Sequence, residues 1–151
     1  LSVEQNLNMM IELQDIRGRK KRELCNRLLD RFSISQIRKT KAGKVSGGER
    51  RRLEIARCLV ANPEIVMLDE PFSGVDPVTV QSIQDTIQVL RKEGISILIT
   101  DHAVREMLEI VDRGYVVSAG EVLFHGTPDE IWKDREVREE YLGSMDQRMS
   151  A

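Results

Sequence analysis

Apolar residues recur every three or four positions over the first third of the chain, a spacing that predicts helices. The first helical set follows Ser2, a residue type that commonly caps a helix N-terminus, and comprises Val3, Leu7, Met10 and Ile11. A second set comprises Leu24, Leu28, Leu29 and Phe32, followed by a short segment at Ile34–Ile37. A lysine-rich loop at residues 39–44 comes next. Residues 1–45 are therefore predicted to form a small helical unit.

A different pattern begins at residue 65. The apolar run Ile65–Leu68 leads directly into two carboxylates, Asp69 and Glu70, and then into Pro71. Such a run predicts a strand that is buried on both faces of a parallel sheet. The strand should end at or near Glu70, because proline cannot donate to a ladder. The two carboxylates are thus expected at the carboxyl end of a central strand, where open α/β sheets bind their ligands.

The segment after this strand predicts a βαβ unit. Asp76 is an N-cap residue followed by proline, and the helix that begins there should end at Gly94. Ile95–Thr100 is a second apolar run and is predicted to be another buried strand. Short loops join the three elements, so the strands should be parallel with a right-handed crossover. His102 would then lie at the same carboxyl edge as Glu70.

The last third predicts a hairpin and further helices. Tyr115–Ser118 and Glu121–Phe124 are short strand patterns on either side of Ala119-Gly120. A helix should begin at Thr127 with a capping box and proline at its first position, and the tail from Arg135 is expected to be helical and then to fray. The predicted fold class is α/β, with a helical subdomain at residues 1–45. Residues 46–151 would form half of a parallel sheet with a C-terminal hairpin and helices.

Composition excludes some classes of function, and the distribution of charge adds a further constraint. Only 4% of the 151 residues are aromatic, which argues against a stacking platform for single-stranded nucleic acid. The apolar runs are too short to span a bilayer, and Cys25 and Cys58 have no disulfide or metal spacing. Residues 1–52 contain 14 Lys and Arg against 6 Asp and Glu, whereas residues 53–151 contain 9 against 19. This asymmetry suggests that the first third meets something acidic.

The segment Ser46-Gly47-Gly48-Glu49 begins a third helix and has two interpretations. Ser46 and Glu49 have the spacing of a capping box, which is a structural role. Two consecutive glycines in a first helical turn each cost about 1 kcal/mol relative to alanine, and a cap alone does not explain them. Glycines at this position allow an anion to approach the positive end of a helix closely. The second interpretation is therefore a phosphate-facing helix start.

The arginine run at residues 50–52 bears on the same question. Cations near the N-terminus of a helix are unfavourable. They become favourable if an anion lies opposite or if local acids such as Glu54 pair with them. Both alternatives are open from the sequence.

Four motifs in order carry a family resemblance. The Ser46–Glu49 segment resembles the signature motif of ATP-binding cassette ATPases, and residues 65–70 resemble their Walker B strand with its catalytic glutamate. The segment Ser73-Gly74-Val75-Asp76 resembles the D-loop, and His102 resembles the switch histidine. Four ordered motifs over residues 46–102 make a specific match. The resemblance implies a partial P-loop NTPase fold of the cassette type.

Several longer segments of the sequence are similar to the ATPases of lipopolysaccharide export transporters. The similarity is carried by residues 46–57, 72–77, 100–102, 125–128 and 141–143. Asp101 precedes His102, an order that is similar to the export branch, whereas in many cassette ATPases the switch histidine precedes an aspartate. The ATPases of branched-chain amino-acid importers share much of the same sequence and are the nearest alternative to the export ATPases.

Two other cassette classes also share these motifs. Chromosome-maintenance and repair ATPase heads bind DNA, but they should carry heptad repeats before the signature, and residues 1–45 contain none. Translation-factor cassette proteins bind the ribosome and carry two cassettes. The sequence of the parent gene would distinguish the translation-factor class. No nucleic-acid partner is expected for this chain.

The resemblance implies a role for each motif residue. Asp69 would hold Mg²⁺, Glu70 would orient or deprotonate the attacking water, and His102 would contact the γ-phosphate of ATP. The remaining nucleotide-binding and interface positions are Ser46, Gly47, Gly48, Glu49, Ser73, Gly74 and Asp76. The signature residues among them would bind the ATP of a partner domain. The complete protein would thus be a head-to-tail homodimer that works with transmembrane permease subunits on the cytoplasmic face of the inner membrane.

One family motif does not occur in this sequence. No G-x-x-x-x-G-K-[ST] phosphate-binding loop is present, and Leu1–Leu7 resembles the start of the family's helical subdomain. The chain is therefore expected to be the carboxyl half of a nucleotide-binding domain and to be inactive as an ATPase by itself. The transported substrate cannot be read from it.

Overall fold

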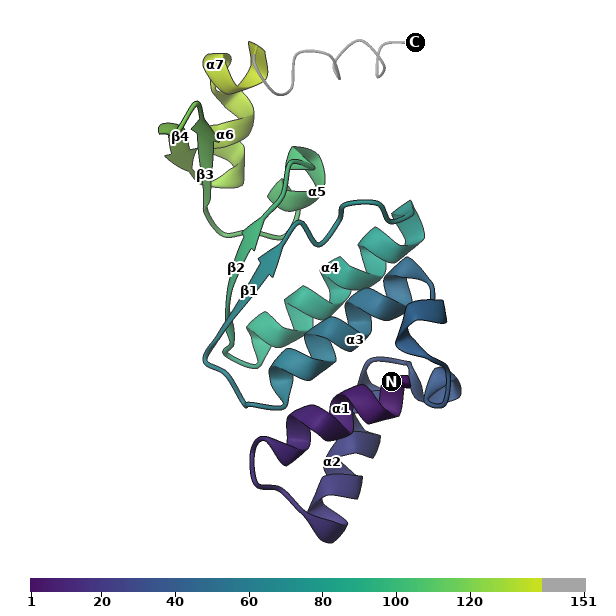
Figure 1. The fold of residues 1–151 in the computed structure, drawn as a ribbon. Helices are drawn as coiled ribbons and strands as arrows, with labels where there is room; N and C mark the ends of the chain where they lie inside the picture. The colour runs from purple at the N-terminus through teal and green to yellow at the C-terminus, as the bar shows by residue number, and fades with distance from the viewer. Residues whose placement is uncertain (140–151) are drawn as a thin grey trace. The chain divides into compact units, whose positions relative to one another are not determined.

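A computed structural model of the chain describes residues 1–139 (Figure 1). The chain forms two compact units that divide after Thr100. The predicted division at residue 45 stays a prediction. Residues 141–143 and the expected fraying at the end of the tail lie outside the described residues. Within residues 1–139, no helix has both the length and the apolar character needed to cross a membrane.

Two helices and two short 3₁₀ turns form the first part of the first unit. They are α1 (Val3–Glu12), α2 (Gly18–Arg31), η1 (Ser35–Ile37) and η2 (Ala42–Lys44). The predicted cap of α1 is present, because Ser2 and Gln5 form a reciprocal capping box. Most of the predicted apolar positions are buried, whereas Met10, Leu24 and Ile37 are only partly buried. The fully buried positions are Val3, Leu7, Ile11, Leu29 and Ile34. The helical character of this segment is confirmed; the lysine-rich loop contains the short turn η2.

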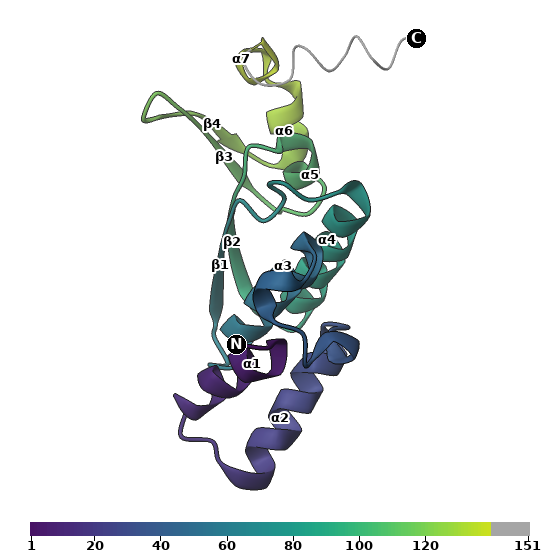
Figure 2. The same ribbon diagram turned by 45° about the vertical axis from the view of Figure 1, so that its right-hand side comes forward.

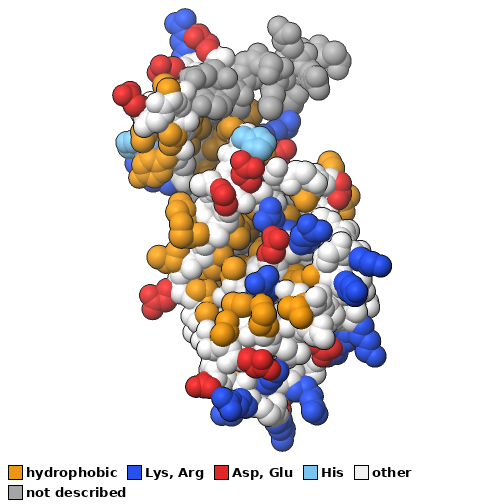
Figure 3. All heavy atoms as spheres, viewed as in Figure 1, with side chains coloured by type: hydrophobic (Ala, Val, Ile, Leu, Met, Phe, Trp, Pro, Cys, Tyr) orange, Lys and Arg blue, Asp and Glu red, His pale blue; other side chains and the backbone are white. Residues whose placement is uncertain are grey.

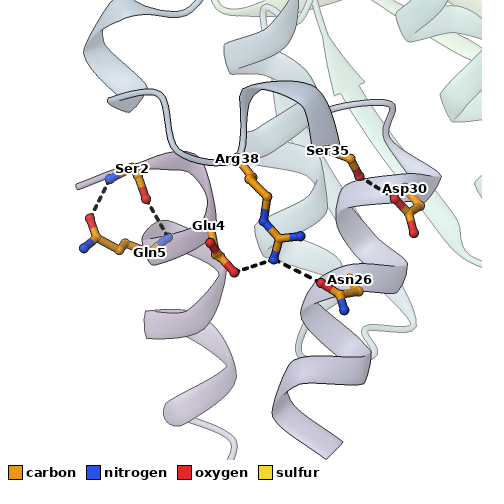
Figure 4. A network of polar contacts seen from close by, with 7 residues as sticks. All are labelled: Ser2, Glu4, Gln5, Asn26, Asp30, Ser35 and Arg38. Carbon is orange, nitrogen blue, oxygen red and sulfur yellow. Dashed lines mark hydrogen bonds and ion pairs between the residues drawn. The ribbon is translucent and has the colours of Figure 1, made fainter.

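A polar network joins this helical layer (Figure 4). Arg38 donates hydrogen bonds to Glu4 on α1 and, over 3.1 Å, to Asn26 on α2. The backbone N–H groups of Val3 and Glu4 also donate to the carbonyls of Thr40 and Arg38, each over 3.0 Å. The Arg38 guanidinium lowers the pKa of the Glu4 carboxyl. The segment after η1 is thereby attached to the first turn of α1.

The second part of the first unit is a βαβ unit covered by one more helix. Its elements are α3 (Gly47–Leu59), β1 (Ile65–Asp69), α4 (Pro77–Lys92) and β2 (Ser96–Thr100). The strands are parallel, as predicted, and Asp69 pairs with Thr100 at the end of the register. Figures 1 and 2 show α3 and α4 on the same side of the two strands. Val66 and Leu68 point to that side and are buried.

The prediction that both strands are buried on two faces is wrong for this chain. On β1, Ile65 is 62% exposed and Met67 is 72% exposed, and on β2 Leu98 is 53% exposed. The physical reason is that, among the described helices of the first unit, α3 and α4 cover one face of the two-stranded sheet, so alternate side chains face outward. Hydrophobic side chains are accordingly exposed over this part of the molecule in Figure 3.

The second unit begins at Asp101. Its elements are α5 (Val104–Leu108), β3 (Gly114–Ser118), β4 (Glu121–Gly126), α6 (Pro128–Lys133) and α7 (Arg135–Val137). The predicted hairpin is present, and both turn residues, Ala119 and Gly120, have the positive φ that a tight hairpin turn favours. The predicted capping box at Thr127 is also present. Ile131 and Val137 form a small core, and the residues packed against it are Val104, Leu108, Val116, Leu123 and Phe124.

Candidate functional site

The carboxyl ends of β1 and β2 hold the two candidate carboxylates. The Thr100 hydroxyl donates a hydrogen bond to Oδ1 of Asp69, its partner in the strand register. The Glu70 N–H donates to the Thr100 carbonyl over 2.7 Å, one residue beyond the end of β1. Both acidic residues are exposed. The structure thus brings Asp69 and Glu70 together at the predicted edge, and Thr100 holds both.

Glu70 leaves strand geometry. Its φ is +45°, in the left-handed region that non-glycine residues seldom occupy. Its carbonyl accepts hydrogen bonds from Ser73 N–H over 3.2 Å and from Arg51 Nη2 over 2.9 Å. The backbone on both sides of this side chain is therefore held by named contacts. Because the strand ends at Asp69, the alternation of strand side chains does not determine where the Glu70 carboxylate points.

The start of α3 is held by a complete capping box. The Glu49 N–H donates to the Ser46 hydroxyl over 3.3 Å, and the Glu49 carboxylate accepts from the Ser46 N–H over 2.8 Å and from its hydroxyl over 2.9 Å. These bonds stabilise the charged carboxylate and lower the pKa of Glu49. The structural interpretation of Ser46 and Glu49 is therefore confirmed.

The two signature glycines differ from each other. A β-carbon on Gly48 would lie 2.7 Å from Thr79 Cγ2 and 2.8 Å from Thr79 Oγ1 on α4. A β-carbon on Gly47 would meet only Val75 Cγ1, at an ordinary 3.6 Å. Gly48 is buried and Gly47 is exposed. Close approach is thus the reason for glycine at position 48, and the approaching group is Thr79 of the same chain. The packing of α3 does not require glycine at position 47.

The loop that joins β1 to α4 ends in a strong helix cap. The Asp76 carboxylate accepts from Thr79 N–H over 3.0 Å and from the Thr79 hydroxyl over 2.6 Å, which lowers the pKa of Asp76. Ser73 and Gly74 are exposed, and Gly74 has a φ of +68°. Because Thr79 contacts Asp76 and also fills the space beside Gly48, the starts of α3 and α4 form one packed structure.

His102 belongs to the second unit. Its side chain is 74% exposed, and its Nδ1 lies 3.8 Å from Oδ1 of Asp101. The Ala103 N–H donates to the same Asp101 oxygen over 3.0 Å. In the chain His102 follows Thr100 by two residues. Its expected position beside Glu70 stays a prediction.

Arg51 is a site residue that the sequence did not single out. From the second turn of α3, its Nη1 pairs with Glu54 over 2.9 Å and its Nη2 reaches the Glu70 carbonyl over 2.9 Å. The spacing of Arg51 and Glu54 on one helix predicts the first contact. The second joins residues 19 positions apart and has no local signal. Arg51 therefore has partners within the protein, and its charge does not require a phosphate.

The carboxylates at the carboxyl ends of β1 and β2 could help to hold a divalent cation. Among residues 1–139, no three His, Cys, Asp or Glu side chains gather into an all-protein metal site. Mg²⁺ commonly binds through one or two carboxylates together with substrate phosphates and water. The single exposed carboxylate of Asp69, oriented by Thr100, fits this mode of binding.

The known proteins that this chain resembles are ATP-binding proteins of ABC transporters. Residues 1–73 match the family model described as ABC transporter. The lipopolysaccharide export system ATP-binding protein LptB of Haemophilus influenzae is 46% identical over 144 residues, covering 95% of this chain and 60% of that protein. The LptB of Escherichia coli is 47% identical over the same shares. This chain is homologous to the ATP-binding cassette ATPases. An uncharacterized ABC transporter ATP-binding protein of Rhizobium meliloti is 48% identical, covering 95% of this chain and 53% of that protein.

Solved cassette structures have the same fold. The ADP conformation of MJ1267, an ATP-binding cassette of an ABC transporter, superposes with a TM-score of 0.79 at 27% identity, covering 95% of this chain and 63% of that one. CbiO1 of Clostridium perfringens, part of the ABC transporter complex CbiONQ, superposes with a TM-score of 0.81 at 27% identity. The match covers 99% of this chain and 61% of that one. The predicted α/β cassette fold is confirmed. The chain spans about 60% of the length of the LptB relatives it matches.

Proposed function

We propose that this chain is the carboxyl-terminal part of the ATP-hydrolysing subunit of an ABC transporter. The observation that carries the proposal is the arrangement of Asp69 and Glu70 on Thr100 at the carboxyl edge of the parallel strands. This edge is where open α/β sheets bind their ligands. The homology to cassette ATPases supports the same assignment of the two carboxylates.

Phosphoryl transfer to water requires positioning and charge stabilisation more than covalent chemistry from the protein. Glu70 would orient or deprotonate the attacking water, and His102 would contact the γ-phosphate. Asp69 would hold Mg²⁺ through water. The bound cation would supply neutralisation of the phosphate charge.

The start of α3 suits an anion from a second subunit. The Ser46 N–H is already taken by Glu49, so the amides left for a phosphate are those of Gly47 and Gly48, which lie in the first helical turn and have no intrahelical acceptor. Gly47 is exposed, and the packing of α3 does not require a glycine at this position, which supports a role for Gly47 in binding. Ser73, Gly74 and Asp76 would lie at the interface between the two subunits.

Partners follow from the transporter assignment. The complete protein would be a homodimer of nucleotide-binding domains attached to transmembrane permease subunits on the cytoplasmic face of the inner membrane. The basic excess of residues 1–52 supports a contact with an acidic surface, and Figure 3 shows Lys and Arg side chains exposed at the α1–α2 end of the first unit. No nucleic acid is included in this proposal.

Substitution of Glu70 in the full-length protein tests the hydrolytic role. Glu70→Gln should retain ATP binding and lose more than about a hundredfold of the steady-state hydrolysis rate. Glu64→Gln is the matched control, because Glu64 is an exposed carboxylate next to the opposite end of the same strand. Its hydrolysis rate should be unchanged. Unchanged hydrolysis in Glu70→Gln would remove Glu70 from the catalytic role.

Lipopolysaccharide export is the transport function that we propose, because the LptB relatives carry that name. Identity alone does not decide it, since the uncharacterized relative is as similar as they are. Reconstitution of the full-length protein with its permease subunits in vesicles distinguishes the candidates. ATP-dependent extraction of lipopolysaccharide is expected, whereas uptake of branched-chain amino acids would establish the importer alternative.

The 151-residue chain by itself is expected to lack ATPase activity, because it contains no phosphate-binding loop motif. Turnover by the purified chain that disappears in Asp69→Ala would contradict this expectation.

A further inference from the structure

The Arg51 side chain contacts the backbone of the candidate catalytic glutamate. Arg51 Nη2 donates to the Glu70 carbonyl over 2.9 Å. Arg51 Nη1 donates to the Glu54 carboxylate, also over 2.9 Å. The Arg51 side chain is 25% exposed, so most of it is packed against the protein. The planar fork of arginine suits this arrangement, because two nitrogens reach two acceptors in a fixed geometry.

The carbonyl that Arg51 contacts belongs to a strained residue. Glu70 has a φ of +45°, and such a conformation persists only where surrounding contacts impose it. The contacts that impose it include Glu70 N–H to the Thr100 carbonyl, Ser73 N–H to the Glu70 carbonyl, and Arg51 to the same carbonyl. The direction in which a side chain leaves the backbone depends on the local φ and ψ. Contacts that hold the N–H and the C=O therefore also orient the carboxylate.

Arg51 also lies on the helix that begins with the signature glycines. It is four residues after Gly47 on α3, and a continuous helix transmits a displacement of its first turn to its second. A shift of the α3 start on binding an anion would therefore reach the Glu70 carbonyl through the Arg51 side chain. Arg51 thus connects α3 directly to the backbone of Glu70.

We propose that Arg51 is a positioning residue that couples the start of α3 to the orientation of Glu70. The inference rests on the proposed ATPase function and adds a form of regulation to the same site. Occupancy of the signature helix by the partner subunit's nucleotide would set the geometry of the glutamate in this subunit. Arg51 itself touches neither water nor phosphate in this scheme.

The test uses steady-state ATP hydrolysis by the full-length protein. Arg51→Met keeps the aliphatic stem and removes all donors, and we expect kcat to fall about tenfold with KM for ATP and the melting temperature unchanged. Arg51→Lys keeps one cationic donor and should recover most of the lost kcat. Arg135→Met is the control, because Arg135 also pairs with a glutamate, Glu139, over 2.8 Å, but its side chain is 90% exposed. It should behave as the wild type.

A second comparison separates this inference from the proposed function. If Glu70→Gln hydrolyses ATP at the wild-type rate, the proposed function fails. If Glu70→Gln is inactive but Arg51→Met retains the wild-type kcat, only the coupling fails. A rise in KM, or a loss of kcat that Arg51→Lys does not recover, would also overturn the positioning role.

Protein stability could confuse the result for Arg51→Met. Glu54→Gln then serves as the second variant, because it leaves Arg51 in place and removes only the negative charge that pairs with Arg51 Nη1. A smaller reduction in kcat, about twofold, is expected with an unchanged KM. No change in kcat in Glu54→Gln, together with an unfolded Arg51→Met, would count against the coupling.

Discussion

Thr79 Cγ2 lies 2.7 Å from the position that a β-carbon on Gly48 would occupy. This relationship joins the first turn of the signature helix α3 to the first turn of α4. Thr79 cannot easily move aside, because it is short and β-branched and its hydroxyl donates to Asp76 over 2.6 Å. A residue of the signature motif and a residue after the D-loop segment are thus fitted to each other within one chain.

Gly48→Ala is predicted to destabilise the chain. Without a clash, alanine would stabilise a helix by about 1 kcal/mol relative to glycine. The added methyl group instead overlaps Thr79, and overpacking of this kind costs about 1–3 kcal/mol. Thermal or urea unfolding should show a lower stability for Gly48→Ala.

Gly47→Ala is the matched control for this prediction. Its β-carbon would meet Val75 Cγ1 at 3.6 Å, which is ordinary contact, so stability should be unchanged or higher. The double variant Gly48→Ala with Thr79→Ala should be less destabilised than the sum of the two single variants. Equal effects of alanine at positions 47 and 48 would contradict the packing argument.

The capping box of α3 should make stability depend on pH. Hydrogen bonds from Ser46 lower the pKa of Glu49 below its ordinary value of 4.5. The unfolded chain therefore takes up a proton at a higher pH than the folded chain does. The contribution of the Glu49 charge is fully present above pH 4.5 and is lost as the pH falls through the lowered pKa.

Unfolding of the wild type and of Glu49→Gln between pH 7 and pH 3 measures this contribution. The stability difference between them should be largest at pH 7 and should disappear in acid. Ser46→Ala should cost about 1 kcal/mol at neutral pH and should reduce the pH dependence, because it removes one of the bonds to Glu49. A difference that stays constant over this range would mean that the charge has no part in the cap.

Arg38→Met is predicted to loosen the α1–α2 layer. Arg38 contacts Glu4 and Asn26, and the side chains of Arg38 and Glu4 are 37% and 32% exposed, so solvent screens part of their attraction. The expected loss is about 1 kcal/mol in the free energy of unfolding. Arg19→Met should change stability by much less, since the Arg19 side chain in its pair with Glu23 is 89% exposed. The prediction fails if the two variants have the same stability.

The exposed face of the β1–β2 sheet is predicted to promote self-association of the 151-residue chain prepared by itself. Ile65, Met67 and Leu98 present adjacent apolar side chains on a sheet with open edges. Sedimentation analysis should show a mass that rises with concentration. Met67→Lys should weaken association, whereas Val89→Lys, at an exposed apolar position on α4, should not. A monomer at all concentrations would refute this prediction.

Local signals accounted for most of the helix boundaries. The capping boxes at Ser2, Ser46 and Thr127 and the cap at Asp76 are each determined by residues within three positions, so they can be read from the sequence. The parallel strands and the hairpin followed from apolar runs bounded by turn residues. Asp69 and Glu70 were expected at a strand end, and they lie there.

Features that depend on distant parts of the chain were not predictable in the same way. The burial of Met67 depends on what lies opposite the strand, which the run of apolar residues does not specify. The helix Val104–Leu108 is too short to display a periodic pattern. The contact between Arg51 and Glu70 and the fit of Thr79 against Gly48 each join separate elements, so they depend on the tertiary structure and have no local sequence signal.

The backbone of Glu70 has a consequence for anyone engineering a more robust form of this protein. At a φ of +45°, glycine carries no steric penalty, whereas glutamate does. A screen for thermal stability would therefore be expected to favour Glu70→Gly. The same substitution would delete the carboxylate on which the proposed hydrolysis depends, so selection for heat resistance alone would drive this position away from catalysis.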